Sequence, residues 1–149
     1  MITEQVILLA EDNDDDAELT IMAFTQAKIA NPVIRVRDGV EALDWLFRRG
    51  EHAARAPEIV PAMVLLDLKM PRLNGIEVLA EIRKDVRIRH LPVIILTSSA
   101  EEHDRISAYE GHANSYVQKP IDYDAFVTVA RQIGVYWMLL NLPAPSHNS

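Results

Sequence analysis

One stretch near the N-terminus decides the fold: Val6-Ile7-Leu8-Leu9-Ala10-Glu11-Asp12, five apolar residues followed by two acids. Three later strand-like runs also end in a polar residue, at Asp67, Thr97 and Lys119. Short apolar runs are typical of strands buried on both faces of a parallel sheet. In open α/β sheets the functional groups gather beyond the carboxyl ends of the strands. We therefore expect three acids, a hydroxyl and an ammonium to meet on one edge of a sheet.

The composition is that of one ordinary globular domain. A length of 149 residues is near the commonest domain size, and 49% hydrophobic and 25% charged residues are typical of a folded domain with a sizeable core. With 22 Asp and Glu against 15 Lys and Arg, the net charge is -7. This charge argues against direct binding of nucleic acid and favours protein partners. The chain has no cysteine, which excludes disulfides and thiolate metal sites.

The N-terminal residues do not have the pattern of a signal peptide. The first residues, Met1 to Gln5, lack the basic start and the longer apolar stretch of a signal peptide. No apolar run approaches the length needed to span a bilayer. We therefore expect a cytoplasmic protein with no membrane partner.

Strand-like and helix-like patterns alternate about five times along the chain, which predicts a parallel sheet with helices on both faces. Further strands are expected at 33–36 and 115–118, and residues 50–61 are expected to form a loop. Asp38, Asn74 and Asp122 are expected to cap helices, the last of which runs to about residue 140. A helix is also expected over 99–110.

Helical spacing of apolar residues predicts the inner face of three helices. The residues expected to face the core are Leu19, Met22, Ala23 and Ala27 in the first helix, Ala42, Leu43, Leu46 and Phe47 in the second, and Ile76, Leu79 and Ile82 in the third. The histidines show no metal-ligand spacing, and we interpret all of them as surface residues: His52, His90, His103, His112 and His147.

Four motifs resemble the marks of bacterial response-regulator receiver domains. They are Glu11-Asp12-Asn13, Leu66-Asp67-Leu68-Lys69-Met70-Pro71, Leu96-Thr97-Ser98 and Lys119-Pro120, and the resemblance runs in the family's order from about Val6 to Arg131. It implies a flavodoxin-like (βα)5 doubly wound parallel sheet with strand order 2-1-3-4-5. The receiver domain is expected over residues 1–142, with a flexible tail at 143–149.

The chemistry of such a site follows from its charges. A carboxylate is ionised near pH 7, so Asp67 can attack phosphorus without a general base. Two unit charges about 4 Å apart repel by roughly 4 kcal/mol at an effective dielectric constant near 20, so clustered acids facing an anionic donor need a cation. Mg²⁺ is the expected ion. The resemblance assigns Asp12 and Asp67 as direct ligands, Glu11 as a ligand through water, and Lys69 as a ligand through its backbone carbonyl.

The resemblance also gives roles to the remaining polar residues. Asp67 is the expected phosphoacceptor, Thr97 and Lys119 are expected to contact the transferred phosphoryl group, and Lys119-Pro120 resembles the family's cis peptide. Tyr116 matches the switch aromatic, which turns inwards when Thr97 moves towards the phosphoryl group. These residues also have plainer interpretations. Glu11-Asp12 could be a solvated helix cap, Thr97 a structural cap at a strand end, and Lys119 a solvated side chain. Tyr116 could be a core residue with its hydroxyl in water.

Three features resemble the regulators paired with bacterial phytochromes: the long loop before the third strand, the segment 91–99 and the tail 136–143. No histidine of this chain has a recognisable role, so we expect the phosphoryl group to come from a histidine of another protein, a sensor kinase. The resemblance implies that this kinase is a bacterial phytochrome. The apolar segment 132–142 is a candidate dimerisation segment, acting together with the surface of the fourth and fifth helices. Alternatively, the tail folds onto its own domain.

Other functions remain open at this point. A haloacid-dehalogenase-like phosphotransferase normally has a second Asp two residues after its nucleophile, where this chain has Lys69. A flavodoxin-like nucleotide-binding module would need a glycine-rich phosphate loop, and the chain has only 5 Gly. A receiver-like adaptor that is never phosphorylated is a third alternative. No helix-turn-helix segment is recognisable, so we do not expect a DNA-binding regulator.

Overall fold

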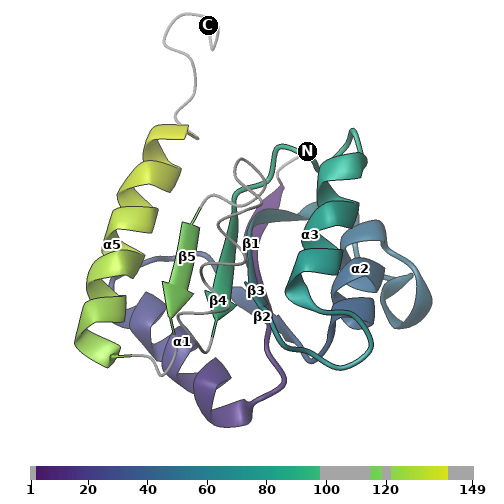
Figure 1. Ribbon diagram of the computed structural model, residues 1–149. Coiled ribbons are helices and arrows are strands. Elements are labelled where there is room, and N and C mark those ends of the chain that lie inside the picture. Colours follow the sequence, from purple (N-terminus) through teal and green to yellow (C-terminus); the bar gives the residue numbers. More distant parts are fainter. Residues whose placement is uncertain (1–2, 98–114, 119–121, 141–149) are drawn as a thin grey trace, which may run out of the picture.

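The computed structural model describes residues 3–97, 115–118 and 122–140, which form one parallel sheet flanked by helices (Figure 1). The elements are β1 (Glu4–Ala10), α1 (Asp14–Gln26), β2 (Val33–Val36), α2 (Gly39–Phe47), the 3-10 helix η1 (Gly50–His52), β3 (Ile59–Asp67), α3 (Gly75–Lys84), β4 (Val93–Thr97), β5 (Ser115–Gln118) and α5 (Tyr123–Leu140). The strand order is β2-β1-β3-β4-β5, which confirms the expected order 2-1-3-4-5. The helix expected over 99–110 lies outside the described residues.

The register of the sheet brings the ends of the central strands level. Ala10 at the end of β1 pairs with Leu66 in β3, and Asp67 pairs with Leu96 in β4. Thr97 in turn pairs with Gln118 in β5. All four strand pairings are parallel, so the residues that follow these strands emerge on the same edge.

Two apolar layers cover the two faces of the sheet. In β1 the residues alternate between them: Leu8 belongs to the layer under α2 and α3, and Leu9 to the layer under α1 and α5. Both are fully buried, which explains why a strand covered on both faces is a continuous apolar run. The second layer includes an edge-to-face contact between Phe24 and Phe126, with ring centroids 6.0 Å apart. Figure 1 shows the helix pairs on opposite sides of the sheet.

The inner face of α1 agrees with the expectation at Ala23, which is fully buried, but not at Met22. Met22 is 48% exposed, whereas Thr20 and Phe24 are buried. The hydroxyl of Thr20 donates a hydrogen bond to the Asp16 carbonyl oxygen at 2.8 Å, so this polar residue can be buried within the helix. The prediction for Met22 was therefore wrong because a satisfied threonine, invisible to an apolar pattern, occupies the inner face.

The expected loop at 50–61 is also shorter than predicted. Residues 50–52 form η1, and β3 begins at Ile59. Pro61, a residue that disfavours central strands, pairs with Val6 next to a register shift between Val6 and Ile7. The pairing of β3 with β4 begins only at Val64, so the proline lies beyond that ladder.

The helix caps follow the sequence closely. Asn74 caps α3 in a capping box with Glu77, and Asp38 caps α2 by accepting a hydrogen bond from the Glu41 amide. Asp122 accepts from the Ala125 amide at 3.1 Å at the start of α5. The caps expected at these three positions are confirmed. Within the described ranges, no helix is long and apolar enough to cross a membrane.

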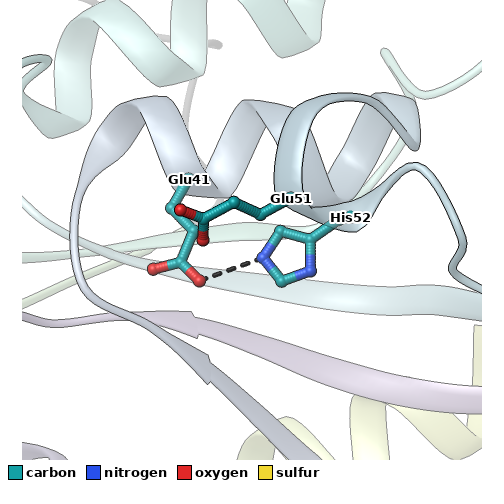
Figure 2. Close-up of side chains that lie close together, drawn as sticks. All are labelled: Glu41, Glu51 and His52. Carbon is teal, nitrogen blue, oxygen red and sulfur yellow. Dashed lines mark hydrogen bonds and ion pairs between the residues drawn. The ribbon is translucent and has the colours of Figure 1, made fainter.

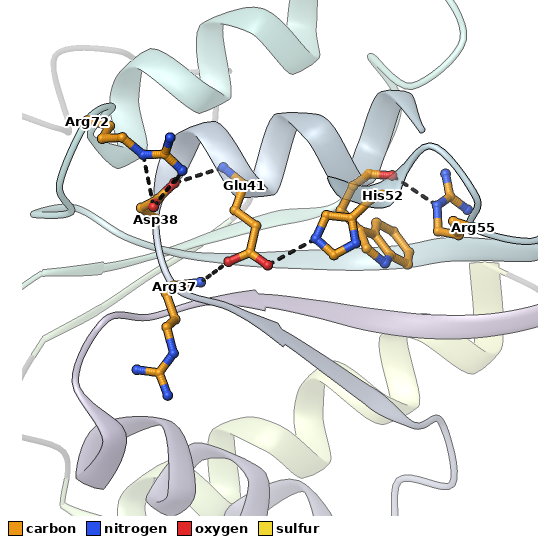
Figure 3. Close-up of polar contacts among 7 residues, drawn as sticks. Arg37, Asp38, Glu41, His52, Arg55 and Arg72 are labelled. Carbon is orange, nitrogen blue, oxygen red and sulfur yellow. Dashed lines mark hydrogen bonds and ion pairs between the residues drawn. The ribbon is translucent and has the colours of Figure 1, made fainter. Parts of the chain in front are cut away.

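Arg55 holds the connection between α2 and β3 in place. Its guanidinium lies 4.2 Å from the centroid of the Trp45 ring and donates hydrogen bonds to the carbonyl oxygens of Trp45, Leu46 and Ile59. Its own amide donates to the His52 carbonyl oxygen at 3.1 Å, as Figure 3 shows. One arginine therefore ties the end of α2 to the start of β3.

We expect Arg55→Ala to lower the free energy of unfolding by about 2–3 kcal/mol, because it removes a stacked cation and leaves partly buried carbonyl oxygens without their donor. Arg55→Lys should recover only part of this loss, since an ammonium cannot reproduce the planar fork. Urea unfolding measures both. The control is Arg49→Ala, at a side chain that is 57% exposed, with an expected effect of about 1 kcal/mol or less. Equal effects of Arg55→Ala and Arg49→Ala would contradict the role of Arg55.

Candidate functional site

Three carboxylates meet at the carboxyl edge of the sheet. Glu11 and Asp12 follow β1, and Asp67 is the last residue of β3. One carboxylate oxygen from each lies within 4.8 Å of the others. Glu11 is fully buried and Asp67 is 6% exposed, whereas Asp12 is exposed. The structure thus brings together the three acids that the sequence places at strand ends.

The acids of the β1–α1 loop are held by the main chain around them. The Glu11 amide donates to the Val36 carbonyl oxygen at 3.0 Å, which extends the β1–β2 ladder by one residue. The Asn13 amide donates to Glu11 Oε2 at 3.3 Å, and the Asn13 side chain caps α1 by accepting from the Asp16 amide at 2.9 Å. The loop therefore turns from the strand into the helix within a few residues, and Asp12 between Glu11 and Asn13 is exposed.

The backbone of Asp67 is enclosed by the start of α3. The Leu68 amide donates to the Leu96 carbonyl oxygen at 2.7 Å, and the Gly75 amide donates to the Leu68 carbonyl oxygen at 2.9 Å. A Cβ atom on Gly75 would lie 2.6 Å from the Asp67 carbonyl oxygen. Only glycine permits this approach, so the helix that follows the loop fixes the strand end that carries Asp67.

The other predicted site residues are placed to different extents. Thr97 is fully buried at the end of β4, the strand next to β3. Lys69 is exposed in the loop after Asp67. Tyr116 lies in β5 and pairs with Ile95, but its side chain is outside the described part of the structure. Lys119 lies outside the described residues.

The donor set fits a hard divalent cation. Carboxylate and carbonyl oxygens are the ligands that Mg²⁺ prefers, and Mg²⁺ usually keeps several waters beside a few protein oxygens. Three carboxylates within 4.8 Å also repel one another, so a cation relieves an unfavourable charge arrangement. The exposed position of Asp12 leaves the site open to solvent and to a substrate.

The loop after Asp67 is clamped to the start of α2. The Arg72 guanidinium binds both carboxylate oxygens of Asp38, with Nε–Oδ2 at 3.0 Å and Nη2–Oδ1 at 2.9 Å (Figure 3). A Cβ atom on Gly39 would lie 2.3 Å from the Leu73 carbonyl oxygen, so the two segments are in close backbone contact. Sequence reasoning identified Asp38 as a cap but missed its partner Arg72.

A second cluster, drawn in Figure 2, is formed between α2 and η1 by Glu41, Glu51 and His52. Their possible ligand atoms lie within 4.8 Å of one another. Glu41 accepts from the Arg37 amide at 3.0 Å, and its Oε2 lies 2.9 Å from His52 Nε2. His52, expected at the surface, is half-buried by this contact. His90 is exposed as predicted, and the histidines at 103, 112 and 147 lie outside the described residues.

A parallel sheet of this order, with clustered acids at its carboxyl edge, defines the receiver class of α/β domain. The model of the "Response regulator receiver domain" family matches residues 7–131. The chain belongs to this family.

Two curated relatives match nearly the whole chain. The probable methanogenesis regulatory protein FilR2 of Methanothrix harundinacea is 39% identical over 142 residues, which cover 95% of this chain and 89% of the relative. The response regulator Rcp1 of Synechocystis is 36% identical over 141 residues and 94% of each chain.

Solved structures of phytochrome response regulators are also similar. The bacteriophytochrome response regulator RtBRR has a TM-score of 0.80 and 45% identity, covering 97% of this chain and 86% of its own. The phosphorylated cyanobacterial phytochrome response regulator RcpA has a TM-score of 0.76 and 34% identity, and the match covers 97% of this chain and 99% of RcpA. The Mn²⁺-bound form of Rcp1 has a TM-score of 0.74 and 34% identity, and the match covers 95% of this chain and 99% of Rcp1.

The contacts of the Asp38 carboxylate predict how the stability of the fold depends on pH. Burial acts to raise the pKa of Asp38, but the hydrogen bond from the Glu41 amide and the Arg72 guanidinium, with the Val40 amide, together hold this pKa below its usual value. Such a carboxylate stabilises the fold above its unfolded-state pKa, and the stabilisation is lost as the pH falls through the lower folded-state pKa.

Below about pH 4 the wild type should therefore lose stability more steeply than Asp38→Asn, which keeps a capping side chain but no charge. At pH 7 we expect Asp38→Asn to be less stable by about 1 kcal/mol. Thermal unfolding between pH 2 and pH 7 measures both effects. The control is Glu81→Gln, which removes an exposed partner of Lys84. This variant should lose stability below about pH 4 as steeply as the wild type does. The prediction is contradicted if Asp38→Asn loses stability below about pH 4 as steeply as the wild type.

Proposed function

We propose that this receiver accepts a phosphoryl group on Asp67 in an Mg²⁺-dependent reaction and signals through the resulting change of conformation. One observation carries the proposal: the carboxylate at the end of β3 lies within 4.8 Å of those of Glu11 and Asp12. In this proposal Asp12 and Asp67 hold the ion directly, Glu11 through water, and Lys69 through its backbone carbonyl oxygen. Phosphorylation of RcpA and Mn²⁺ binding by Rcp1, as named for those proteins, support it.

The transfer uses the ionised carboxylate of Asp67 as its nucleophile. One carboxylate oxygen forms a bond to phosphorus while the phosphorus–nitrogen bond of a phosphohistidine donor breaks, and the leaving imidazole takes a proton from solvent. The products are an acyl phosphate on Asp67 and a neutral histidine on the donor. When bound, the ion supplies positive charge between the acids and the phosphoryl oxygens. The chain therefore promotes its own phosphorylation and, with water as the attacking group, its own dephosphorylation.

Thr97 and Lys119 complete the site in this proposal. The Thr97 hydroxyl donates a hydrogen bond to a phosphoryl oxygen, and the Lys119 ammonium balances the charge on another. Thr97 is already buried at the end of β4, beside the strand that ends in Asp67. A small movement of Thr97 towards the phosphoryl group opens space near β5, and Tyr116 turns into this space as the switch residue.

The proposed partner is a sensor histidine kinase, and specifically a bacterial phytochrome. The solved regulators RtBRR and RcpA carry phytochrome in their names and match 97% of this chain. FilR2, at 39% identity, is named for methanogenesis instead, so a kinase with another input is the alternative that a phosphotransfer assay must test. With its net charge of -7, the chain is suited to protein partners in the cytoplasm and not to DNA.

We also propose a homodimer. Helix α5 continues to Leu140, beyond residue 131 where the family match ends. The added turns fall in the apolar segment 132–142, which would pack against a second copy together with the surface formed by the fourth and fifth helices. Residues 1–142 form the receiver in this proposal, and 143–149 form a tail.

Incubation with Mg²⁺ and acetyl phosphate should label the wild type with one phosphoryl group that alkali removes, and Asp67→Asn should not be labelled. Chelation of Mg²⁺ with EDTA, or Asp12→Asn, should reduce the initial rate at least about 100-fold. The control is Asp15→Asn, an exposed acid of α1, which should keep the wild-type rate. Intact-protein mass spectrometry and Phos-tag gels measure the product.

Equal labelling of Asp67→Asn and the wild type would contradict the assignment of Asp67. An absence of label on every variant would indicate a receiver-like adaptor. A second arm uses an autophosphorylated bacteriophytochrome kinase as donor beside a kinase with a different input. Faster transfer from the phytochrome kinase supports the proposed pairing, and faster transfer from the other kinase contradicts it.

Light scattering should give a dimer mass for the full chain and a monomer mass for a chain truncated after Arg131, because the truncation removes the apolar segment. The full-length variant Trp137→Glu provides the same test without shortening α5, since a charge in an apolar interface is costly to bury. A wild-type monomer at all concentrations would contradict the proposed dimer.

A further inference from the structure

Arg35 is a charged residue in a strand where apolar residues are expected. Strand β2 reads Val33-Ile34-Arg35-Val36, and the Arg35 side chain is only 19% exposed. Arginine is rarely buried to this extent unless its donors are satisfied. The position of this guanidinium therefore requires specific partners.

Those partners lie at the two ends of the β1–α1 loop. Arg35 Nε and Nη2 donate to the Glu11 carbonyl oxygen at 3.0 and 2.8 Å, and Arg35 Nη1 binds Asp14 Oδ1 at 2.6 Å. The fork of one guanidinium thus spans the loop that carries Glu11 and Asp12. A two-point contact of this kind restrains direction as well as distance.

The peptide unit held by Arg35 is the one that joins Glu11 to Asp12. On the other side of the same residue, the Glu11 amide donates to the Val36 carbonyl oxygen at 3.0 Å. Two consecutive residues of β2 therefore hold the backbone of Glu11 from both ends. The orientation of this peptide sets the direction in which the Asp12 side chain leaves the main chain.

We propose that Arg35 is a positioning residue that preorganises the Glu11-Asp12 loop for a divalent cation. This inference rests on the proposed function of the site, and it assigns a role to a residue outside the acidic cluster. Partners that orient metal ligands from outside the ligand set commonly change metal affinity by about 10–100-fold when removed. Asp14 pairs with the guanidinium and so offsets part of the positive charge that Arg35 brings near the acids.

Arg37 supplies a matched comparison in the same chain. Its Nη1 lies 3.0 Å from the same oxygen of Asp14, but its side chain is 61% exposed. Within the described residues, Arg37 contacts Asp14 and does not reach the Glu11 carbonyl oxygen. Removing either arginine takes one positive charge from Asp14, whereas only Arg35 holds the peptide between the two acids.

The test measures Mg²⁺ binding to the unphosphorylated full-length chain by isothermal titration calorimetry. Relative to wild type, Arg35→Ala should raise the dissociation constant at least about tenfold, and Arg37→Ala should change it less than about twofold. Arg35→Lys should remain several-fold weaker than wild type, because an ammonium cannot reproduce the two-point contact with a carbonyl oxygen. Urea unfolding without metal shows whether each variant is folded. If Arg35→Ala is unfolded, the comparison of dissociation constants uses Arg35→Lys instead.

A second measurement separates positioning from chemistry. At saturating Mg²⁺, Arg35→Ala should regain the wild-type rate of labelling by acetyl phosphate, because Asp67 and Thr97 are unchanged. Equal dissociation constants for Arg35→Ala and Arg37→Ala would overturn the proposal, and so would a rate defect that persists at saturating Mg²⁺. A failure of the proposed function is distinguishable, since the wild type itself would then show neither Mg²⁺ binding nor label on Asp67.

Discussion

The parallel pairing of β1 with β3 is the constraint on which the rest of the structure depends. It sets Ala10 beside Leu66, so the residues that follow, Glu11 and Asp67, emerge together although they are far apart along the chain. The apolar layers on both faces stabilise this pairing and leave the strands no freedom to slip, because a shift by one residue would exchange the two buried faces. The packing of the core thus forces the acids together despite their repulsion, which a bound cation would offset.

The loops that carry the acids are restrained by contacts with other parts of the chain. Arg35 and Val36 hold the β1–α1 loop from β2. The β3–α3 loop is held by the ion pair of its Arg72 with Asp38, the N-cap of α2, and by the close approach of Gly75 in α3. Both arginines bind an acid outside the cluster, Asp14 for Arg35 and Asp38 for Arg72, which offsets part of their charge. Such preorganisation would favour the proposed binding of Mg²⁺, which demands near-ideal ligand geometry.

Sequence reasoning succeeded where one residue type has one dominant structural use. The apolar runs that end in polar residues were strands, and Asp38, Asn74 and Asp122 were caps. It failed where burial depends on a partner supplied by the fold. The inner face of α1 includes Thr20 because its hydroxyl bonds within the helix, and His52 is half-buried because Glu41 of α2 lies 2.9 Å away.

The sequence by itself determined the class of the protein, because short apolar runs ending in acids, a threonine and a lysine specify a parallel sheet with its chemistry at one edge. The strand order came from resemblance and was confirmed by the structure. Only the tertiary structure decided which charged side chains support the site. Arg35, Arg37 and Arg72 look alike in a sequence, but their guanidinium groups differ in burial and in the atoms they contact. Those differences arise from packing between segments distant along the chain, which no local pattern encodes.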